Sequence, residues 1–290
     1  MTLPRFAIAI ALALVLPAAV LNASQTASCN FTTFSAPADY TLNQVSGIAD
    51  DGTVVGQLID NDTGETQAFA RSSNGAFTRF QAPNSLNTWF YGGNSSVNAG
   101  TFQIIAYPQG VHGFFLQAGK FTEVNYPGAT NTWLYDINQT GTAVGSYSVS
   151  PSVTKGFVLA GGKYTSIAYP KSAATYAQAI SDSGVVAGSY ADGWVTHGFL
   201  WQNGTFTPVN HPNARWGSAL LGVNNSGTAV GNYFAGDFAY GFVYKNGTFE
   251  NIVYSGAQFT NAGGINNNGV ISGQILDADG NTLGFTATCK

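Results

Sequence analysis

A short motif that begins with an aromatic residue recurs along this chain of 290 residues. Its six copies are "FTTFSAP", "FTRFQAP", "FTEVNYP", "YTSIAYP", "FTPVNHP" and "FENIVYS", which begin at Phe31, Phe77, Phe121, Tyr164, Phe206 and Phe249. Successive copies start 42 to 46 residues apart. A period of this length indicates one supersecondary unit that is repeated and stacked, because a single unit cannot bury its own hydrophobic surface.

Each repeat contains four runs of strand length, and the third repeat shows them most clearly. The runs "KFTEVNYP", "TWLYDIN", "TAVGSYS" and "KGFVLA" follow one another with short connections between them. Pairs such as Asn-Gly and Ser-Gly in two of the connections favour hairpin turns, because Asn and Gly tolerate positive φ angles. Four antiparallel strands and this period predict an all-β fold, a six-bladed β-propeller. A β-sandwich offers no reason for six near-equal copies.

Proline and glycine positions predict the order of strands within a blade. We expect "TWLYDIN" to be innermost and the aromatic-Thr run to be outermost, because proline ends that run and is tolerated at a sheet edge. The prolines concerned are Pro37, Pro83, Pro127, Pro170 and Pro212. A glycine recurs in the second strand, where we expect neighbouring blades to pack closely. These glycines are Gly56, Gly145, Gly188, Gly231 and Gly273.

The first 27 residues have the pattern of a secretory signal peptide. Arg5 precedes the apolar run "FAIAIALALVLPAAV", which Pro17 and the polar "NASQTAS" end before it is long enough to span a membrane. We expect cleavage after Ala23 or Ala27. Residues 28–290 are then one secreted domain, extracellular or periplasmic, with no membrane span.

The two cysteines bracket the repeats, and we expect them to be bonded, because an exported chain meets an oxidising compartment. The last repeat has a third strand, "GFTAT", but no outermost strand, whereas the first repeat supplies an outermost strand with no third strand before it. Pairing these ends closes the ring. Alignment with "GFVLAGGKYTSI" places Cys289 at Gly161 and Cys29 at Gly162, so the disulfide replaces a hairpin turn.

The repeat resembles a family of bacterial extracellular proteins named for a His-Ala-Phe motif, the HAF repeat proteins. The matching segments are "VHGFF", "THGFL", "TQAFA", "TKGFV" and "AYGFV", together with "GIADDGTVVG", "DINQTGTAVG", "GVNNSGTAVG" and "GINNNGVISG". The resemblance covers about Phe31 to Thr288 and implies secretion and a repeat scaffold without a defined activity. Only two of the six copies have histidine at the position that names the family, His112 and His197.

The amino-acid composition limits the classes of partner that the chain can bind. The chain has 10 Lys and Arg against 14 Asp and Glu and no basic cluster, so nucleic acid is not an expected partner. Large aromatic residues recur in or directly after the connection from each outermost strand to the next innermost strand. They are Tyr40, Trp89, Trp133, Tyr176, Trp216 and Phe259. Trp194 falls in a connection that opens on the same face of a propeller. Aromatic rings stack on sugar rings or apolar ligands, although such rings can equally pack between blades.

The sequence offers two further kinds of candidate site, Asp-rich turns and histidines. Two Asp-rich turns contain Asp60 and Asp62 in the first repeat and Asp277 and Asp279 in the last, and they resemble calcium loops without completing the EF-hand pattern. Asp and Asn are also ordinary turn residues. His112, His197 and His211 fall on different blades and form no predicted site. No cofactor is therefore expected, and calcium at these turns is the one candidate.

The sequence favours a secreted, non-catalytic module that binds a glycan or another extracellular polymer through its aromatic face. One alternative is a polysaccharide hydrolase or lyase that works at the channel mouth, where a propeller could bring two carboxylates together. A second alternative is a structural surface or matrix protein.

Overall fold

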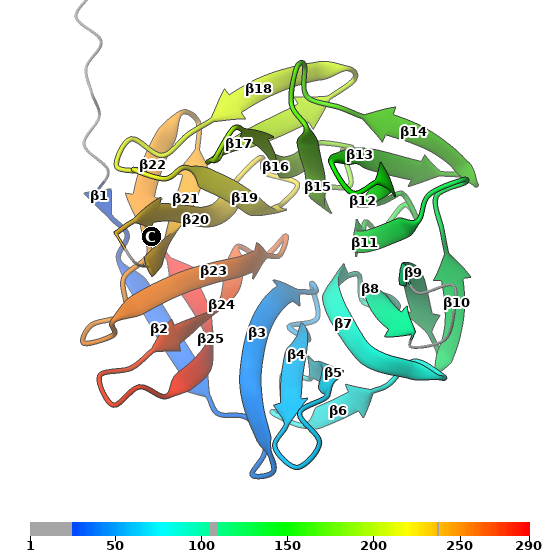
Figure 1. Ribbon diagram of the computed structural model, residues 1–290. Helices are drawn as coiled ribbons and strands as arrows, with labels where there is room; N and C mark the ends of the chain where they lie inside the picture. Colours follow the sequence, from blue (N-terminus) through cyan, green and yellow to red (C-terminus); the bar gives the residue numbers. More distant parts are fainter. Residues whose placement is uncertain (1–24, 105–109, 237) are drawn as a thin grey trace, which may run out of the picture.

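The structure is a computed structural model that describes residues 25–104, 110–236 and 238–290. All of the regular secondary structure in these ranges is β-strand. The strands form twisted antiparallel sheets arranged in a ring around a central axis (Figure 1). The predicted all-β propeller class is therefore confirmed.

Four strands of each repeat pair antiparallel from the axis outward. The innermost strands are β3 (Tyr40–Ile48), β7 (Ser85–Gly93), β11 (Asn131–Ile137), β15 (Ala174–Ile180), β19 (Ser218–Val223) and β23 (Phe259–Ile265). The second strands are β4 (Val54–Asp60), β8 (Val97–Ile104), β12 (Ala143–Ser150), β16 (Val186–Asp192), β20 (Ala229–Ala235) and β24 (Val270–Leu276). The third strands are β5 (Thr66–Arg71), β9 (Gly110–Gln117), β13 (Val153–Ala160), β17 (Val195–Gln202), β21 (Phe238–Lys245) and β25 (Thr282–Cys289). The outermost strands are β6 (Phe77–Phe80), β10 (Lys120–Val124), β14 (Lys163–Ile167), β18 (Thr205–Val209), β22 (Thr248–Asn251) and β2 (Cys29–Phe34).

We number these sets of four strands units 1 to 6, in the order of their innermost strands from β3 to β23. Hydrogen bonds do not keep the units as six separate sheets. A parallel bridge between Thr154 and Ala174 joins units 3 and 4 into one eight-stranded sheet. The short strand β1 (Gln25–Thr26) adds to β22 in parallel and makes the sheet of unit 5 five-stranded. The expectation of six independent four-stranded blades is thus too simple, because the described strands form five hydrogen-bonded sheets.

A phenylalanine on each third strand forms the centre of its unit. Phe69, Phe114, Phe157, Phe199, Phe242 and Phe285 are all fully buried. Each is paired across the sheet with a glycine of the second strand, for example Phe157 with Gly145. A Cβ atom on Gly145 would lie 2.1 Å from the Trp133 carbonyl oxygen and 2.6 Å from the Phe157 ring. The recurrent glycine therefore makes room for a carbonyl oxygen of the innermost strand and, except at Gly231, for the phenylalanine of its own unit. Its predicted role between neighbouring blades was wrong.

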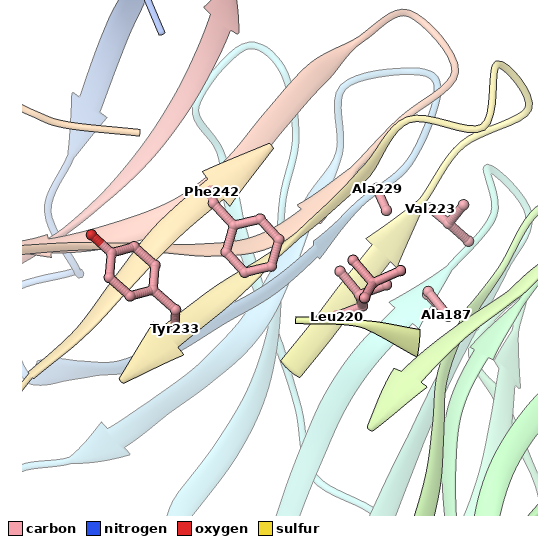
Figure 2. Packing of buried hydrophobic residues seen from close by; sticks show 8 residues of the cluster. Ala187, Leu220, Val223, Ala229, Tyr233 and Phe242 are labelled. Carbon is pink, nitrogen blue, oxygen red and sulfur yellow. The ribbon is translucent and has the colours of Figure 1, made fainter. Parts of the chain in front are cut away.

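Neighbouring units bury a second layer of apolar side chains between them. Figure 2 shows the cluster where unit 4 meets unit 5, in which Ala187 of β16 lies near Leu220 and Val223 of unit 5, and Phe242 lies next to Tyr233. Small residues on one sheet face large residues on the next. This alternation lets twisted sheets approach closely without leaving voids.

The predicted signal peptide falls mainly on residues 1–24, which lie outside the described residues. Of its last three residues, Gln25 and Thr26 form β1, and Ala27 is buried with its N–H donating to the Asn251 carbonyl at 2.9 Å. Cleavage after Ala23 would keep this short strand, whereas cleavage after Ala27 would remove it. Across the described ranges there is no helix with the length and apolar character needed to cross a membrane.

The ring closes as the sequence predicts. Strand β2 pairs antiparallel with β25, and the last pair in this register is Cys29 with Cys289, which are joined by a disulfide. The pair before it, Asn30 with Thr288, occupies the place that Lys163 and Ala160 occupy in unit 3, directly before a Gly161–Gly162 turn. The disulfide therefore replaces a hairpin turn and links the first and last strands of the repeat array.

We expect Cys289→Ser to lower the melting temperature while the propeller still forms. The bond spans 260 residues, and closing such a loop removes up to about 5 kcal/mol of unfolded-state entropy in the chain-entropy model. Thermal unfolding followed by far-UV circular dichroism measures the effect. The double variant Cys29→Ser, Cys289→Ser is the control and should unfold at the same temperature as the single variant. An unchanged melting temperature in both variants would show that the bond contributes nothing.

Candidate functional site

The turns between innermost and second strands form one end of the propeller. In unit 3, Asn138 Oδ1 accepts hydrogen bonds from the N–H groups of Thr140 and Thr142 within its own turn. Its Nδ2 donates to the Ser181 carbonyl in the corresponding turn of unit 4 at 3.0 Å. The same double role is played by Asn94, Asn224 and Asn266. These asparagines, which the sequence identified only as turn formers, tie neighbouring units together around the axis.

A small cavity of about 70 Å³ lies on the axis, lined by the ends of all six innermost strands. Asp136 of β11 reaches into it. Its carboxylate accepts hydrogen bonds from the N–H groups of Gly93 (3.1 Å), Ile137 (2.9 Å) and Ile180 (3.0 Å), which belong to units 2, 3 and 4. Burial nevertheless raises the pKa of Asp136 to about 6. The carboxylate therefore joins three units, and we assign it a structural role that the sequence did not indicate.

The opposite end of the propeller carries the connections from outermost to innermost strands, which are anchored by a recurring hydroxyl group. In unit 3, Thr132 Oγ1 accepts the N–H of Tyr126, six residues earlier. The same six-residue interval occurs at Thr88, Thr175 and Thr260. In unit 5 the anchor is Ser218, whose Oγ accepts the N–H of His211, seven residues earlier. The connection into unit 5 is therefore one residue longer than the other four.

This longer connection carries Trp216, whose side chain is 63% exposed. The backbone is held on both sides, because the N–H groups of Arg215 and Trp216 both donate to the Phe234 carbonyl at 2.9 and 3.1 Å, while the Phe234 N–H donates to Gly217. Gly217 has φ +106°, and a Cβ atom there would lie 2.0 Å from the Thr196 carbonyl oxygen. Only glycine permits this approach.

A parallel bridge between Thr196 and Gly217 brings the tip of the β16–β17 hairpin beside this connection. Asp192 pairs with Val195, so Gly193 and Trp194 form the two-residue turn of the hairpin. The Trp194 side chain is fully exposed, at 101% of its reference area. Two exposed tryptophans from different units are therefore presented at one boundary on short, hydrogen-bonded segments.

An open hollow of about 680 Å³ lies beside the connection that carries Trp216, and residues 212–215 of this connection line it. Its walls come from the same connection, with Pro212 and Arg215, and from the second and third strands, with Tyr233 and Tyr240. We call Trp194, Trp216 and this hollow the unit 4/5 surface.

The other predicted aromatic residues lie in different environments. Trp89, Trp133 and Tyr176 occupy equivalent positions within β7, β11 and β15 and are partly buried. Tyr40 lies under the guanidinium of Arg79, 4.4 Å from its ring centre. The ring centres of Phe259 and Phe238 lie 5.7 Å apart. Phe238 belongs to the β20–β21 hairpin and was not among the predicted residues. The predicted set therefore contains two exposed rings and five that contact the protein more closely.

Exposed apolar residues are unevenly distributed around this face. Among the described residues, the large hydrophobic side chains that are exposed are Val149, Val153, Trp194, Trp216, Phe238 and Val253. All lie in or directly beside connections of units 3 to 6 that open on the same face. The apolar surface is therefore confined to part of the ring and includes the unit 4/5 surface.

The three histidines lie in separate ring stacks, one in each of three units. His112 stacks on Phe102 and His197 on Tyr190, with ring centres 5.4 and 5.1 Å apart. His211 stacks on Tyr233 at 3.8 Å and is 2% exposed. Burial lowers the pKa of His211 to about 4. The histidines do not converge, in agreement with the sequence.

In the two Asp-rich turns, the first aspartate of each turn accepts hydrogen bonds from backbone N–H groups of the same turn. Asp60 Oδ1 accepts the N–H groups of Thr63 and Asp62 at 3.1 and 3.0 Å, and these bonds lower the pKa of Asp60. Asp277 Oδ1 accepts the N–H groups of Asn281 and Asp279 at 2.7 and 3.0 Å, with the same effect on its pKa. Within the described ranges, no three His, Cys, Asp or Glu side chains are placed to hold a metal ion. Calcium binding at Asp60, Asp62, Asp277 and Asp279 stays a prediction.

Comparison with known proteins supports the fold. No family model and no curated protein matches the sequence, so the resemblance to HAF repeat proteins stays a prediction. A gluconolactonase from Xanthomonas campestris matches with a TM-score of 0.55 and 10% identity, over 92% of this chain and 97% of that one. A catalytically inactive virginiamycin B lyase from Staphylococcus aureus matches with a TM-score of 0.52 and 10% identity, over 90% and 99%. The β-propeller domain of a protease from Pyrococcus furiosus, described as having an open velcro topology, matches with a TM-score of 0.50 and 9% identity, over 86% and 79%. At these identities the similarity shows a shared fold alone.

Asp136 and His211 should give opposite pH dependences of stability. The pKa of Asp136 is raised from 3.8 to about 6, so its contribution to stability is lost as the pH rises through this window. The pKa of His211 is lowered from 6.5 to about 4, so its contribution is lost as the pH falls through a similar window. In the unmodified protein the two effects should largely cancel between pH 4 and about 6.

Two variants separate these contributions. His211→Tyr introduces the residue that units 3 and 4 carry at this position, Tyr126 and Tyr169, and should leave a melting temperature that falls as the pH rises from about 4 to 6. Asp136→Asn should leave one that rises over the same range. Melting curves at several pH values test this, and equal slopes in both variants and the unmodified protein would contradict it.

Proposed function

We propose that the chain is a secreted, six-bladed β-propeller that binds a glycan or another extracellular polymer at the unit 4/5 surface without altering it chemically. The observation that carries this proposal is the pair of exposed tryptophans, Trp194 and Trp216, joined by the bridge between Thr196 and Gly217. Exposed apolar surface of this kind is costly in water and is typical of binding sites. A ring fixed on a short turn loses little conformational entropy when a sugar stacks on it.

The local sequence supports a binding role because it departs from the repeat where the tryptophans lie. The connection into unit 5 is one residue longer than its counterparts, and Gly217 adopts a backbone conformation that most residues avoid. Departures from an otherwise regular pattern are expected at functional sites. Neither feature is needed to close the ring.

Export is supported by two independent features. The leader pattern precedes the repeats, and the Cys29–Cys289 disulfide is of a kind that persists in oxidising compartments. The HAF repeat resemblance is consistent with an extracellular or periplasmic location.

The catalytic alternative would place chemistry at the axis. Two of the similar structures are named a gluconolactonase and a lyase. Three carboxylates, those of Asp50, Asp136 and Asp182, line the axial cavity. All three hydrogen bonds of Asp136 come from backbone N–H groups, and Asp50 and Asp182 accept hydrogen bonds from the turns of neighbouring units. This arrangement supports a structural role better than a catalytic one. The unit 4/5 surface, which lies at the other end of the propeller, is the better-supported site.

The proposal is tested by screening the mature protein against cellulose, chitin, peptidoglycan and soluble cell-wall polysaccharides, with product analysis of every ligand that binds. The double variant Trp194→Ala, Trp216→Ala should weaken binding about tenfold or more, because each stacked ring contributes about 1 kcal/mol. The melting temperature should change little, since both rings are exposed.

The matched control is the double variant Trp194→Phe, Trp216→Phe, which keeps a ring at each position and should retain more of the affinity. Equal losses in the Ala and Phe variants would argue against stacking. Failure to bind any polymer in the screen would remove the proposal, and product formation would favour the enzyme.

A further inference from the structure

Arg215 stands apart from the other arginines of the described chain. The guanidinium of Arg71 lies 4.4 Å from the Phe34 ring centre, and that of Arg79 lies at the same distance from Tyr40. Arg215 is exposed, and within the described ranges its guanidinium makes neither an ion pair nor a ring contact. It is thus a free bidentate donor in a chain with only 10 basic residues.

The position of Arg215 is fixed by its backbone. Arg215 and Trp216 are adjacent in the lengthened connection, and their N–H groups share the Phe234 carbonyl as acceptor. The Arg215 side chain lines the hollow of about 680 Å³ together with Tyr233 and Tyr240. No Asp or Glu is among the described residues that line this hollow. A positively charged donor therefore lines a space wide enough for a sugar unit, and the next residue in the chain carries an exposed aromatic ring.

We infer that the hollow binds a carboxylate-bearing sugar unit of an acidic polysaccharide, whose ring stacks on Trp216 while its carboxylate pairs with Arg215. This inference rests on the proposed function and names the class of ligand for the same surface. Arginine suits a carboxylate because its planar guanidinium offers two parallel N–H donors. A neutral sugar can stack on Trp216 equally well but leaves the charge of Arg215 unpaired.

Acidic residues near the unit 4/5 surface should lower its affinity for an acidic polymer. Asp192 ends β16 in the neighbouring hairpin and is the nearest acidic residue along that turn to Trp194. Asp237, next to Gly236 in the chain, lies outside the described residues. The chain has a net charge of −4 and therefore repels an acidic polymer at long range. This repulsion opposes binding most strongly at low salt, where it is least screened. Asp192→Asn is therefore expected to strengthen this binding at low salt.

The test compares the affinities of the mature protein for polygalacturonate and for the same polymer with its carboxylates methyl-esterified, at equal chain length. We expect the acidic polymer to bind at least ten times more tightly. Arg215→Gln should reduce this ratio to near one, because it weakens binding of the acidic polymer most. Lys120→Gln is the matched control, because it removes one positive charge from a turn between third and outermost strands at the opposite end, and it should preserve the ratio.

The possible outcomes separate this inference from the proposed function. Equal affinities for acid and ester, or equal effects of Arg215→Gln and Lys120→Gln, would overturn the carboxylate site while leaving a neutral glycan on Trp194 and Trp216. Binding that depends on Arg215 but is unaffected by Trp216→Ala would overturn the stacking arrangement. Dextran sulfate is a third ligand for the binding assay. If it binds as tightly as polygalacturonate, the surface recognises negative charge in general, and the inference is overturned.

Discussion

The pairing of β2 with β25 is the interaction on which the rest of the structure depends. Each unit is a small twisted sheet whose two faces are apolar, so it is stable only between two neighbours. A linear array would leave the faces of units 1 and 6 exposed. The N-terminal strand joins the last unit and thereby makes every unit an interior one, and the disulfide holds this pairing at the point where the other units have a covalent turn.

The two ends of the closed propeller are held together by different hydrogen bonds. At one end, asparagine side chains donate from turn to turn and Asp136 joins three innermost strands. That end is held together by polar contacts close to the axis. At the other end, a recurring hydroxyl group anchors the connections, and the connection into unit 5 is longer than the others and adds backbone hydrogen bonds with Phe234. The length and composition of a connection can therefore change while the ring stays closed. The exposed tryptophans lie at this second end.

Much of the fold could be predicted because it depends on regular spacing. The aromatic-Thr motif marks the outermost strands, the Asn-Gly turns mark hairpins, and the incomplete first and last repeats identify the closure and the disulfide. The glycine of the second strand was assigned to the wrong contact, because the sequence does not tell whether a small residue faces a neighbouring sheet or a ring of its own unit. The bridge between Thr154 and Ala174 depends on local twist, so the merging of two blades into one sheet could not be foreseen.

The candidate site was only partly predictable for a similar reason. The sequence placed seven aromatic residues at one end but could not distinguish Trp133, which is partly buried within an innermost strand, from Trp216, which projects from a connection. The signal that separates them is the extra residue between His211 and Ser218, which is visible only once the hydroxyl anchors fix the alignment of the connections. Arg215 and Phe238 were missed because a single exposed residue carries no pattern.

In the proposed function, the lengthened connection into unit 5 serves binding and not folding. Replacing residues 212–217, "PNARWG", with residues 170–174, "PKSAA", tests this, because it restores the six-residue interval found in unit 4. The melting temperature of this variant and its affinity for the polymer that the intact protein binds are then measured together. The propeller should unfold at nearly the same temperature while binding is lost. Retained binding, or a large fall in melting temperature, would show that the connection belongs to the scaffold and not to a site.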